Sequence, residues 1–198
     1  NGRLMFLRPH CRSFVRWCLE HFWVVVWSTG MRKNVLPLVS FTFPEEGQQP
    51  AAILDQNDCT PTGVFHTGNK HKMLQLKQLQ RLWSRPDIQR LDGGPFDPHN
   101  TLLLDDSPYK AIANPPHTAV HPMEWAAANT NEVLEEALGP EGHIRNLLVR
   151  YAHAEDGHEV VKEWNATARE FWMRPEDDPN YAALLKLPLA KRASWGAR

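Results

Sequence analysis

Two short apolar runs without polar alternation place the strongest constraint on the fold of this chain. They are Trp23–Trp27 and Thr101–Leu104, and each stops abruptly at polar residues. A strand that is buried on both faces has this pattern, and such strands belong to parallel sheets covered by helices. A third strand is predicted at Thr118–Val120. The sequence therefore indicates an α/β fold with a parallel central sheet.

The segments between these runs show helical spacing of apolar residues or turn composition. Helices are predicted at 9–22, 30–39 (shortened or bent by Pro37), 74–83, 129–138, 142–153 and 157–172. Residues 41–70 are predicted to be an insert with hairpin character and a short strand at 51–54. Residues 84–100 are predicted to be a loop. The Pro-rich, polar residues 173–198 have the composition of a poorly ordered tail.

Length, charge and cysteine content limit the class of protein. A chain of 198 residues suits one globular domain, with or without a helical extension. A net charge of −1 gives no long-range attraction to nucleic acid or anionic membranes, so neither is expected as a partner. The longest apolar run, 22–27, is too short to span a bilayer. Three cysteines without a disulfide pattern favour a reducing compartment, the cytoplasm or the nucleus.

The first strand run is followed by residues suited to an anion. Ser28, Thr29 and Gly30 lie between this strand and the next predicted helix. Free backbone N–H groups at a helix start point toward a bound anion, so these residues are candidate phosphate ligands. A helix cap is the alternative explanation, because serine and threonine are common there.

The second strand run ends in two carboxylates, Asp105 and Asp106. Ligands of an open parallel sheet bind outside the carboxyl ends of its strands, so both strand ends should lie at one edge. Two like charges there need a cation, and Mg²⁺ held by carboxylate and phosphate oxygens is the expected cofactor. Lys77 is predicted to balance the remaining phosphate charge, with Lys70 and Lys72 as the substitutes.

Other polar residues fit ordinary roles. Asn165-Ala166-Thr167 matches a glycosylation acceptor by coincidence, and Gly93-Gly94 is a turn signal. Five scattered histidines lack the paired spacing of a zinc site and are interpreted as surface or loop residues: His66, His71, His99, His117 and His121.

Four segments together resemble the FCP/SCP-like (NLI-interacting-factor-like) phosphatase domain of the haloacid-dehalogenase superfamily. The similarity covers about Leu7 to Pro122. The motifs that carry it are Arg8-Pro9-His10 with Phe14, Val24-Val25-Val26-Trp27-Ser28-Thr29-Gly30, Leu76-Lys77-Gln78-Leu79, and Leu102-Leu103-Leu104-Asp105-Asp106-Ser107-Pro108.

The resemblance implies a haloacid-dehalogenase-like, Rossmannoid three-layer fold with C-terminal helices. It also implies hydrolysis of phosphoserine or phosphothreonine in a protein through an aspartyl-phosphate intermediate with Mg²⁺. Ser28 would bind the phosphoryl oxygens and Lys77 would offset their charge. Asp105 would ligate Mg²⁺, and Asp106 would ligate it directly or through water. Residues 1–125 are then the phosphatase-like domain, 126–172 a C-terminal helical extension and 173–198 the tail.

The chain departs from the family pattern at the nucleophile. The family's first motif, a strand ending in a nucleophilic aspartate, should precede Arg8, yet none of the seven residues before it is acidic. We therefore expect a fragment that lacks this strand, with Asn1-Gly2 as the stump of the motif. Asp55-Gln56-Asn57-Asp58 imitates the motif locally, but its position between the second and third motifs favours a coincidence.

Two functions remain open at this point. The first is a Mg²⁺-dependent phosphoprotein phosphatase domain that is inactive in this form. The second is a non-catalytic scaffold that grips peptides, similar to the mitochondrial import-receptor subunit that shares the domain.

Overall fold

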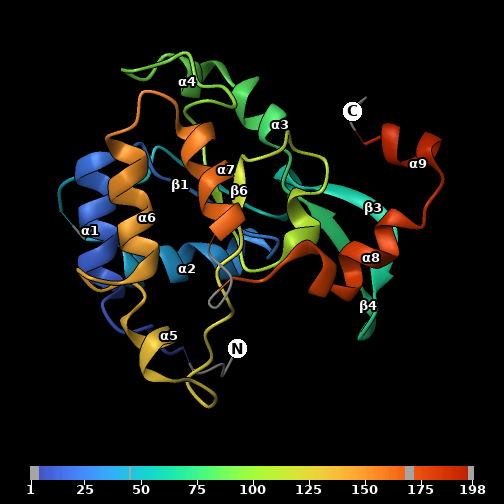
Figure 1. Cartoon of the computed structure of the whole chain (residues 1–198), viewed down its shortest axis with the longest axis horizontal. Helices are drawn as coiled ribbons and strands as arrows, with labels where there is room; N and C mark the ends of the chain where they lie inside the picture. Colours follow the sequence, from blue (N-terminus) through green and yellow to red (C-terminus); the bar gives the residue numbers. More distant parts are fainter. Residues whose placement is uncertain (1–4, 45, 168–171, 196–198) are drawn as a thin grey trace.

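The computed structural model describes residues 5–44, 46–167 and 172–195 (Figure 1). The strands are β1 (Val25–Trp27), β2 (Ala52–Leu54), β3 (Thr60–His66), β4 (Asn69–Leu76), β5 (Leu103–Leu104) and β6 (Ala119–Val120). The α-helices are α1 (Cys11–His21), α2 (Arg32–Thr42), α3 (Leu79–Trp83), α4 (Pro86–Gln89), α5 (Glu132–Glu136), α6 (His143–Ala152), α7 (Gly157–Thr167), α8 (Pro179–Leu185) and α9 (Leu189–Ala193). The 3-10 helices are η1 (Gln56–Asp58), η2 (Pro108–Ala111) and η3 (Pro175–Asp177).

Within the described residues the strands form three separate two-stranded sheets. Strand β1 runs parallel to β2, and β5 runs parallel to β6. Strands β3 and β4 form an antiparallel hairpin. The mixed α/β class, the parallel strands and the hairpin insert are confirmed. The single central sheet is not found, because β1 and β5 are not hydrogen-bonded to each other.

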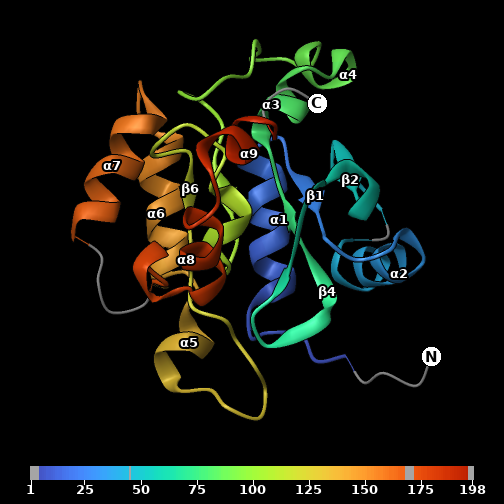
Figure 2. The same ribbon diagram turned by 90° about the vertical axis from the view of Figure 1, so that its right-hand side faces the viewer.

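Helices α1, α6 and α7 form a layer on one side of the strands (Figures 1 and 2). Arg145 of α6 lies over the ring of Trp17 of α1, 3.9 Å from its centroid. The buried residues that join α5, α6 and α7 to β6 form one cluster, which is Val120, Ala137, Ile144, Leu147, Val161 and Trp172. These C-terminal helices therefore share their core with the strand that follows the Asp-Asp pair.

A second cluster joins α3 and α4 to strands of both parallel pairs. It consists of Leu54, Leu79, Leu82, Ile88 and Leu103. The predicted loop at 84–100 thus contains a helical turn, α4, with Pro86 in its first turn. The turn fixes the loop that leads into β5.

The prediction of a helix at 74–83 is wrong in its first half. Leu74 and Leu76 lie in β4, where they alternate with more exposed residues and are fully buried. The helix starts only at Leu79. The spacing of Leu76, Leu79 and Trp83 also fits a helix, but pairing with β3 decides for a strand. Lys77 consequently lies in the link between β4 and α3.

The described part of 173–198 does not fit a poorly ordered tail. It forms η3, α8 and α9, and α8 packs against the hairpin (Figures 1 and 2). Leu184 and Trp195 are buried with Leu74, Leu76 and Tyr109 in a third cluster. Apolar side chains spaced along this segment outweigh its polar composition.

The remaining predicted helices are found with shifted ends. Helix α2 contains Pro37, and α5, α6 and α7 are shorter than predicted. The last residues of the helix predicted at 157–172 lie partly outside the described residues. None of the described helices is long and apolar enough to cross a membrane.

Candidate phosphate site

The centre of the candidate site is the ammonium group of Lys77. Its Nζ donates to the backbone carbonyl of Trp27 at 2.6 Å and to Oδ2 of Asp105 at 2.5 Å. The Lys77 side chain is only 7% exposed. The Lys77 side chain thus bridges the carboxyl ends of β1 and β5. Two of its three ammonium N–H donors are used by described residues, which leaves one for a ligand.

Asp105 lies between two lysines. Its Oδ2 accepts from Lys77, and its Oδ1 accepts from Lys110 Nζ at 2.8 Å and from the Ser107 backbone N–H at 2.9 Å. Burial pushes the pKa of Asp105 upward, but Lys77 and Lys110 outweigh burial and lower it to about 2. Two lysines therefore supply the counter-charge that the acidic strand end was expected to need.

Ser28 follows β1 directly. Its backbone N–H donates to the Leu54 carbonyl at 3.0 Å, which continues the ladder to β2. Its hydroxyl oxygen accepts from the Gly30 N–H at 3.0 Å, so its own proton is left to donate. A Cβ at Gly30 would come within 3.2 Å of that oxygen, so glycine keeps the space beside it. Ser28 lies next to the carbonyl that holds Lys77.

Thr29 and Asp106 occupy the margins of the site. Thr29 lies between Ser28 and Gly30, ahead of α2, whose first residue is Arg32. The side chain of Asp106 is 43% exposed; its Oδ1 lies 3.5 Å from Lys110 and accepts from the Ser107 hydroxyl at 2.8 Å. Asp106 is thus separate from the buried Lys77–Asp105 pair.

The arrangement suits an oxyanion at the edge of the sheet. Two ammonium groups, Lys77 and Lys110, contact the buried carboxylate of Asp105, and Lys110 also lies 3.5 Å from Asp106. The Ser28 hydroxyl, oriented by the Gly30 N–H, follows the carbonyl that accepts from Lys77. Such a group of donors can bind a phosphoryl group.

The sequence profile of the NLI interacting factor-like phosphatases matches residues 1–148. The chain belongs to this family. The match confirms the resemblance found in the motifs and extends past Pro122 into α6. No curated protein sequence gave a significant match.

The residues of the family's expected metal motif do not form a Mg²⁺ site by themselves. Both oxygens of Asp105 accept from lysines, and the described residues include no group of three histidine, cysteine or acidic side chains placed to hold a metal ion. Mg²⁺ prefers near-octahedral oxygen ligands. A further oxygen donor is needed before a cation can replace the lysines at Asp105.

Asp55, the alternative nucleophile, is used as a turn cap. It is buried at the end of β2, its Oδ1 accepts from the Asn57 N–H at 2.9 Å, and Asp58 returns a bond to its backbone in a capping box. Arg32 lies 3.5 Å from its other oxygen. These contacts favour the interpretation of Asp55 as a coincidental match to the family's first motif.

Two residues of the site were missed by the motif analysis. Lys110 lies in η2, which begins at Pro108, and its ammonium group donates to Oδ1 of Asp105. Asp105 outweighs burial and raises the Lys110 pKa. His121, interpreted as an ordinary loop histidine, follows β6 with its Nδ1 2.7 Å from the Asp105 carbonyl. The proline turn after the acidic pair is the signal that points to Lys110; His121 has no comparable local signal.

Proposed function

We propose that this domain hydrolyses phosphomonoesters of serine or threonine in proteins through an aspartyl-phosphate intermediate, and that the 198-residue chain itself has negligible activity. The contact that carries the proposal is the Lys77 ammonium held between the Trp27 carbonyl and the Asp105 carboxylate. It supports a phosphate site at the junction of two strand ends. Membership of a phosphatase-like family supports the same reaction class.

Each residue has a stated part in the proposal. Lys77 offsets phosphoryl charge with its remaining donor, and the Ser28 hydroxyl donates to a second phosphoryl oxygen. Thr29 offers its backbone N–H group, and the Gly30 N–H orients the Ser28 hydroxyl. Asp105 holds Lys77 in place and, with Asp106, is the proposed metal-binding pair once a further oxygen donor completes the site. Mg²⁺ is the proposed cofactor because the family's chemistry uses a metal to neutralise phosphoryl charge.

The nucleophile is the part that these residues do not provide. The first acidic residue in the sequence is Glu20, in α1, and Asp55 caps a turn. A carboxylate nucleophile must reach the phosphorus atom in line with the leaving group.

The proposed location is the cytoplasm or the nucleus. The free cysteines Cys11, Cys18 and Cys59 support it, because thiols stay reduced in these compartments.

Phosphate binding and turnover should be measured separately. Titration with inorganic phosphate in a calorimeter should show saturable binding that Lys77→Met abolishes and that Lys72→Met, on the exposed part of β4, leaves unchanged. Phenyl phosphate hydrolysis with Mg²⁺ should stay at the buffer rate. Equal binding by both variants would overturn the phosphate site. Mg²⁺-dependent hydrolysis would overturn the inactivity and return Asp55 as a nucleophile.

A further inference from the structure

Residues 172–195, which we call the C-terminal strap, lie against the segments that hold the candidate site. The strap contains η3, α8 and α9, and Figures 1 and 2 show it passing from beside β6, along the hairpin, to the side of α3. The family profile matches residues 1–148, so the strap lies outside the matched part of the chain. Its role therefore has to be inferred from its own contacts.

The first contact of the strap is with the residues that follow β6. The Met173 N–H donates to the His121 carbonyl at 2.7 Å, and Trp172 pairs with Pro122 in an isolated β-bridge. The imidazole Nδ1 of His121 lies 2.7 Å from the Asp105 carbonyl. Because a carbonyl oxygen only accepts, Nδ1 carries the proton in this contact. The start of the strap thus reaches the backbone of Asp105 through a single residue.

The second contact holds the backbone next to Lys110. The Tyr109 N–H donates to Oδ2 of Asp178 at 3.0 Å, and Oδ1 of Asp178 accepts from the Asn180 N–H at 2.8 Å. The Asp178 residue is only 6% exposed. Burial of a carboxylate is costly, and an uncharged serine or asparagine caps a helix equally well. Asp178 therefore does more than cap α8, because it also fixes the backbone of η2.

The third contact holds the backbone next to Lys77. The buried side-chain amide of Gln78 donates to the Trp195 carbonyl at 3.0 Å, and its oxygen accepts from the Thr60 hydroxyl in β3. The Lys77 N–H in turn donates to the Lys110 carbonyl at 2.8 Å. The two segments that carry the site lysines are thus bonded to each other, and each of them is bonded to the strap.

Apolar packing keeps the strap against the same segments. The third buried cluster combines side chains of the strap, of β4 and of η2, which are Leu184, Trp195, Leu74, Leu76 and Tyr109. At the end of the hairpin, Oδ1 of Asn180 accepts from the N–H and the hydroxyl of Thr67, at 2.9 and 3.1 Å. Since the cluster includes the residue before Lys110, displacement of the strap should also displace η2.

The candidate site depends on the relative positions of three segments that belong to different elements. Lys77 lies between β4 and α3, Asp105 follows β5, and Lys110 lies in η2. The bonds from the two ammonium groups to the Asp105 carboxylate are 2.5 and 2.8 Å long. A displacement of η2 by roughly 1 Å would take the Lys110 bond out of hydrogen-bonding range. Small movements of the strap therefore matter to the charges at the site.

We propose that the C-terminal strap sets the positions of Lys77 and Lys110 and thereby controls the binding of a phosphate group to them. Asp178 is the positioning residue, since its hydrogen bonds to Tyr109 and Asn180 involve neither lysine. The effect on binding rests on the proposed function, whereas the effect on the lysine-bearing segments rests on the contacts alone. Because coupling between two sites is reciprocal, a bound phosphate also stabilises the docked strap.

Asp178→Ser in the full chain separates the positioning role from the helix cap. The serine hydroxyl still caps α8, but it is too short to reach the Tyr109 N–H. Asp177→Ser is the matched control, because it removes the same charge from the adjacent side chain, which is 51% exposed and contacts Arg174. Thermal unfolding curves identify a temperature at which both variants are fully folded, and all measurements are made at this temperature.

Hydrogen exchange measures whether the strap holds the lysine-bearing segments. In Asp178→Ser the backbone N–H groups of Tyr109 and Lys77 should exchange about tenfold faster than in the parent, because a hydrogen bond to a charged acceptor is lost. The rates are compared with those of α6, which belongs to a separate buried cluster and reports any general loss of stability. Asp177→Ser should exchange like the parent. Exchange at Lys77 that is as slow in Asp178→Ser as in the parent would overturn the proposal, whether or not the chain binds phosphate.

Titration with inorganic phosphate measures whether the strap controls the site. Asp178→Ser should bind phosphate at least about fivefold more weakly than the parent, whereas Asp177→Ser should bind it no more weakly. Loss of a negative charge by itself favours an anion, so weaker binding has to come from displaced lysines. Saturating phosphate should also slow the exchange of the Tyr109 N–H in the parent but not in Lys77→Met, which a purely structural role of Asp178 would not produce.

Two outcomes of the titration are decisive in different ways. Equal phosphate affinity of Asp178→Ser and the parent would overturn the control of binding by the strap. If the parent itself binds no phosphate, the proposed function fails, and the exchange rate at Lys77 then decides by itself whether the strap positions the lysines.

Discussion

Replacement of Asp105 by Asn removes one charge from the site and almost no volume. In the parent, Asp105 is the counter-charge of two lysines whose side chains are 7% and 14% exposed. In the variant, Lys77 and Lys110 stay close together but have lost the counter-charge of Asp105. Removal of one partner from a buried pair costs about 3–5 kcal/mol, because the remaining charge stays buried.

The pH dependence gives an independent estimate of the same interaction. The folded-state pKa of Asp105 is about 2, against an ordinary value of 3.8. A difference of 1.8 pKa units corresponds to roughly 2 kcal/mol. Because the folded pKa is depressed, this stability is present above about pH 4 and is lost as the pH falls toward 2. Asp105→Asn should not show this loss of stability at acidic pH, because asparagine does not titrate there.

Urea unfolding followed by tryptophan fluorescence measures both the free energy of unfolding at pH 7 and its dependence on acidic pH. At pH 7 we expect Asp105→Asn to lower the free energy of unfolding by about 2–5 kcal/mol. Asp92→Asn, in the exposed loop before β5, should change it by less than about 0.5 kcal/mol. Adding Lys77→Met to Asp105→Asn should recover part of the loss. Equal stability of Asp105→Asn and the parent, or an unchanged acid dependence, would refute the role of the buried pair.

Three further predictions concern other parts of the fold. Burial and Arg8 lower the pKa of His143 to about 4, so the unfolded chain gains its proton first on acidification; the parent should lose stability as the pH falls from 6.5 to 4, and a stability curve of His143→Phe with the same slope would contradict this. Leu184→Ala should cost about 2–5 kcal/mol in urea unfolding because this side chain is fully buried against the hairpin, and a neutral effect would show that the C-terminal segment does not contribute to the core. Asp178→Ala should cost about 1–3 kcal/mol, since its carboxylate caps α8 and accepts from the Tyr109 N–H at 3.0 Å; hydrogen exchange at Tyr109 as slow as in the parent would count against it.

Local pattern was sufficient to predict the strand ends. The apolar runs before Ser28 and Asp105 are short, rich in branched or aromatic residues and abruptly terminated, and all three properties belong to the strand itself. The prediction that parallel strands place their carboxyl ends together then brought Lys77 and Asp105 to one point, which the 2.5 Å contact shows. The assignment of metal and phosphate roles to these residues stays a prediction.

Interactions between distant segments could not be predicted in this way. Leu74 and Leu76 fit a helix as well as a strand until the partner strand β3 is considered. The contact of His121 with the Asp105 carbonyl depends on the pairing of β5 with β6. Helix α8 lies in the segment predicted to be poorly ordered, and its formation depends on the packing of Leu184 against the hairpin. In each case the deciding partner is more than ten residues away.

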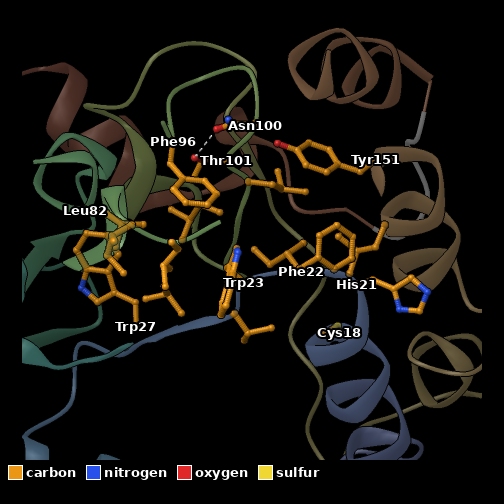
Figure 3. Close-up of a pocket in the computed structure, with 18 of the residues that line it drawn as sticks. Cys18, His21, Phe22, Trp23, Trp27, Leu82, Phe96, Asn100, Thr101 and Tyr151 are labelled. Atoms are coloured by element: carbon orange, nitrogen blue, oxygen red, sulfur yellow. Dashed lines mark hydrogen bonds between the residues drawn. The ribbon is translucent and has the colours of Figure 1, made fainter. Parts of the chain in front are cut away.

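Strands β1 and β5 are more exposed than their composition predicts. The apolar runs predict burial on both faces, yet all three residues of β1 are only partly buried and Leu104 is 36% exposed. A cavity of about 550 Å³ that both strands help to line lies beside these side chains (Figure 3). Apolar surface that stays in contact with water forgoes about 25 cal/mol of stabilisation for each Å². The two parallel strand pairs are therefore held together mainly by the Lys77 contacts at their carboxyl ends and by the cluster of Leu54, Leu79, Leu82, Ile88 and Leu103, and not by hydrogen bonds between β1 and β5.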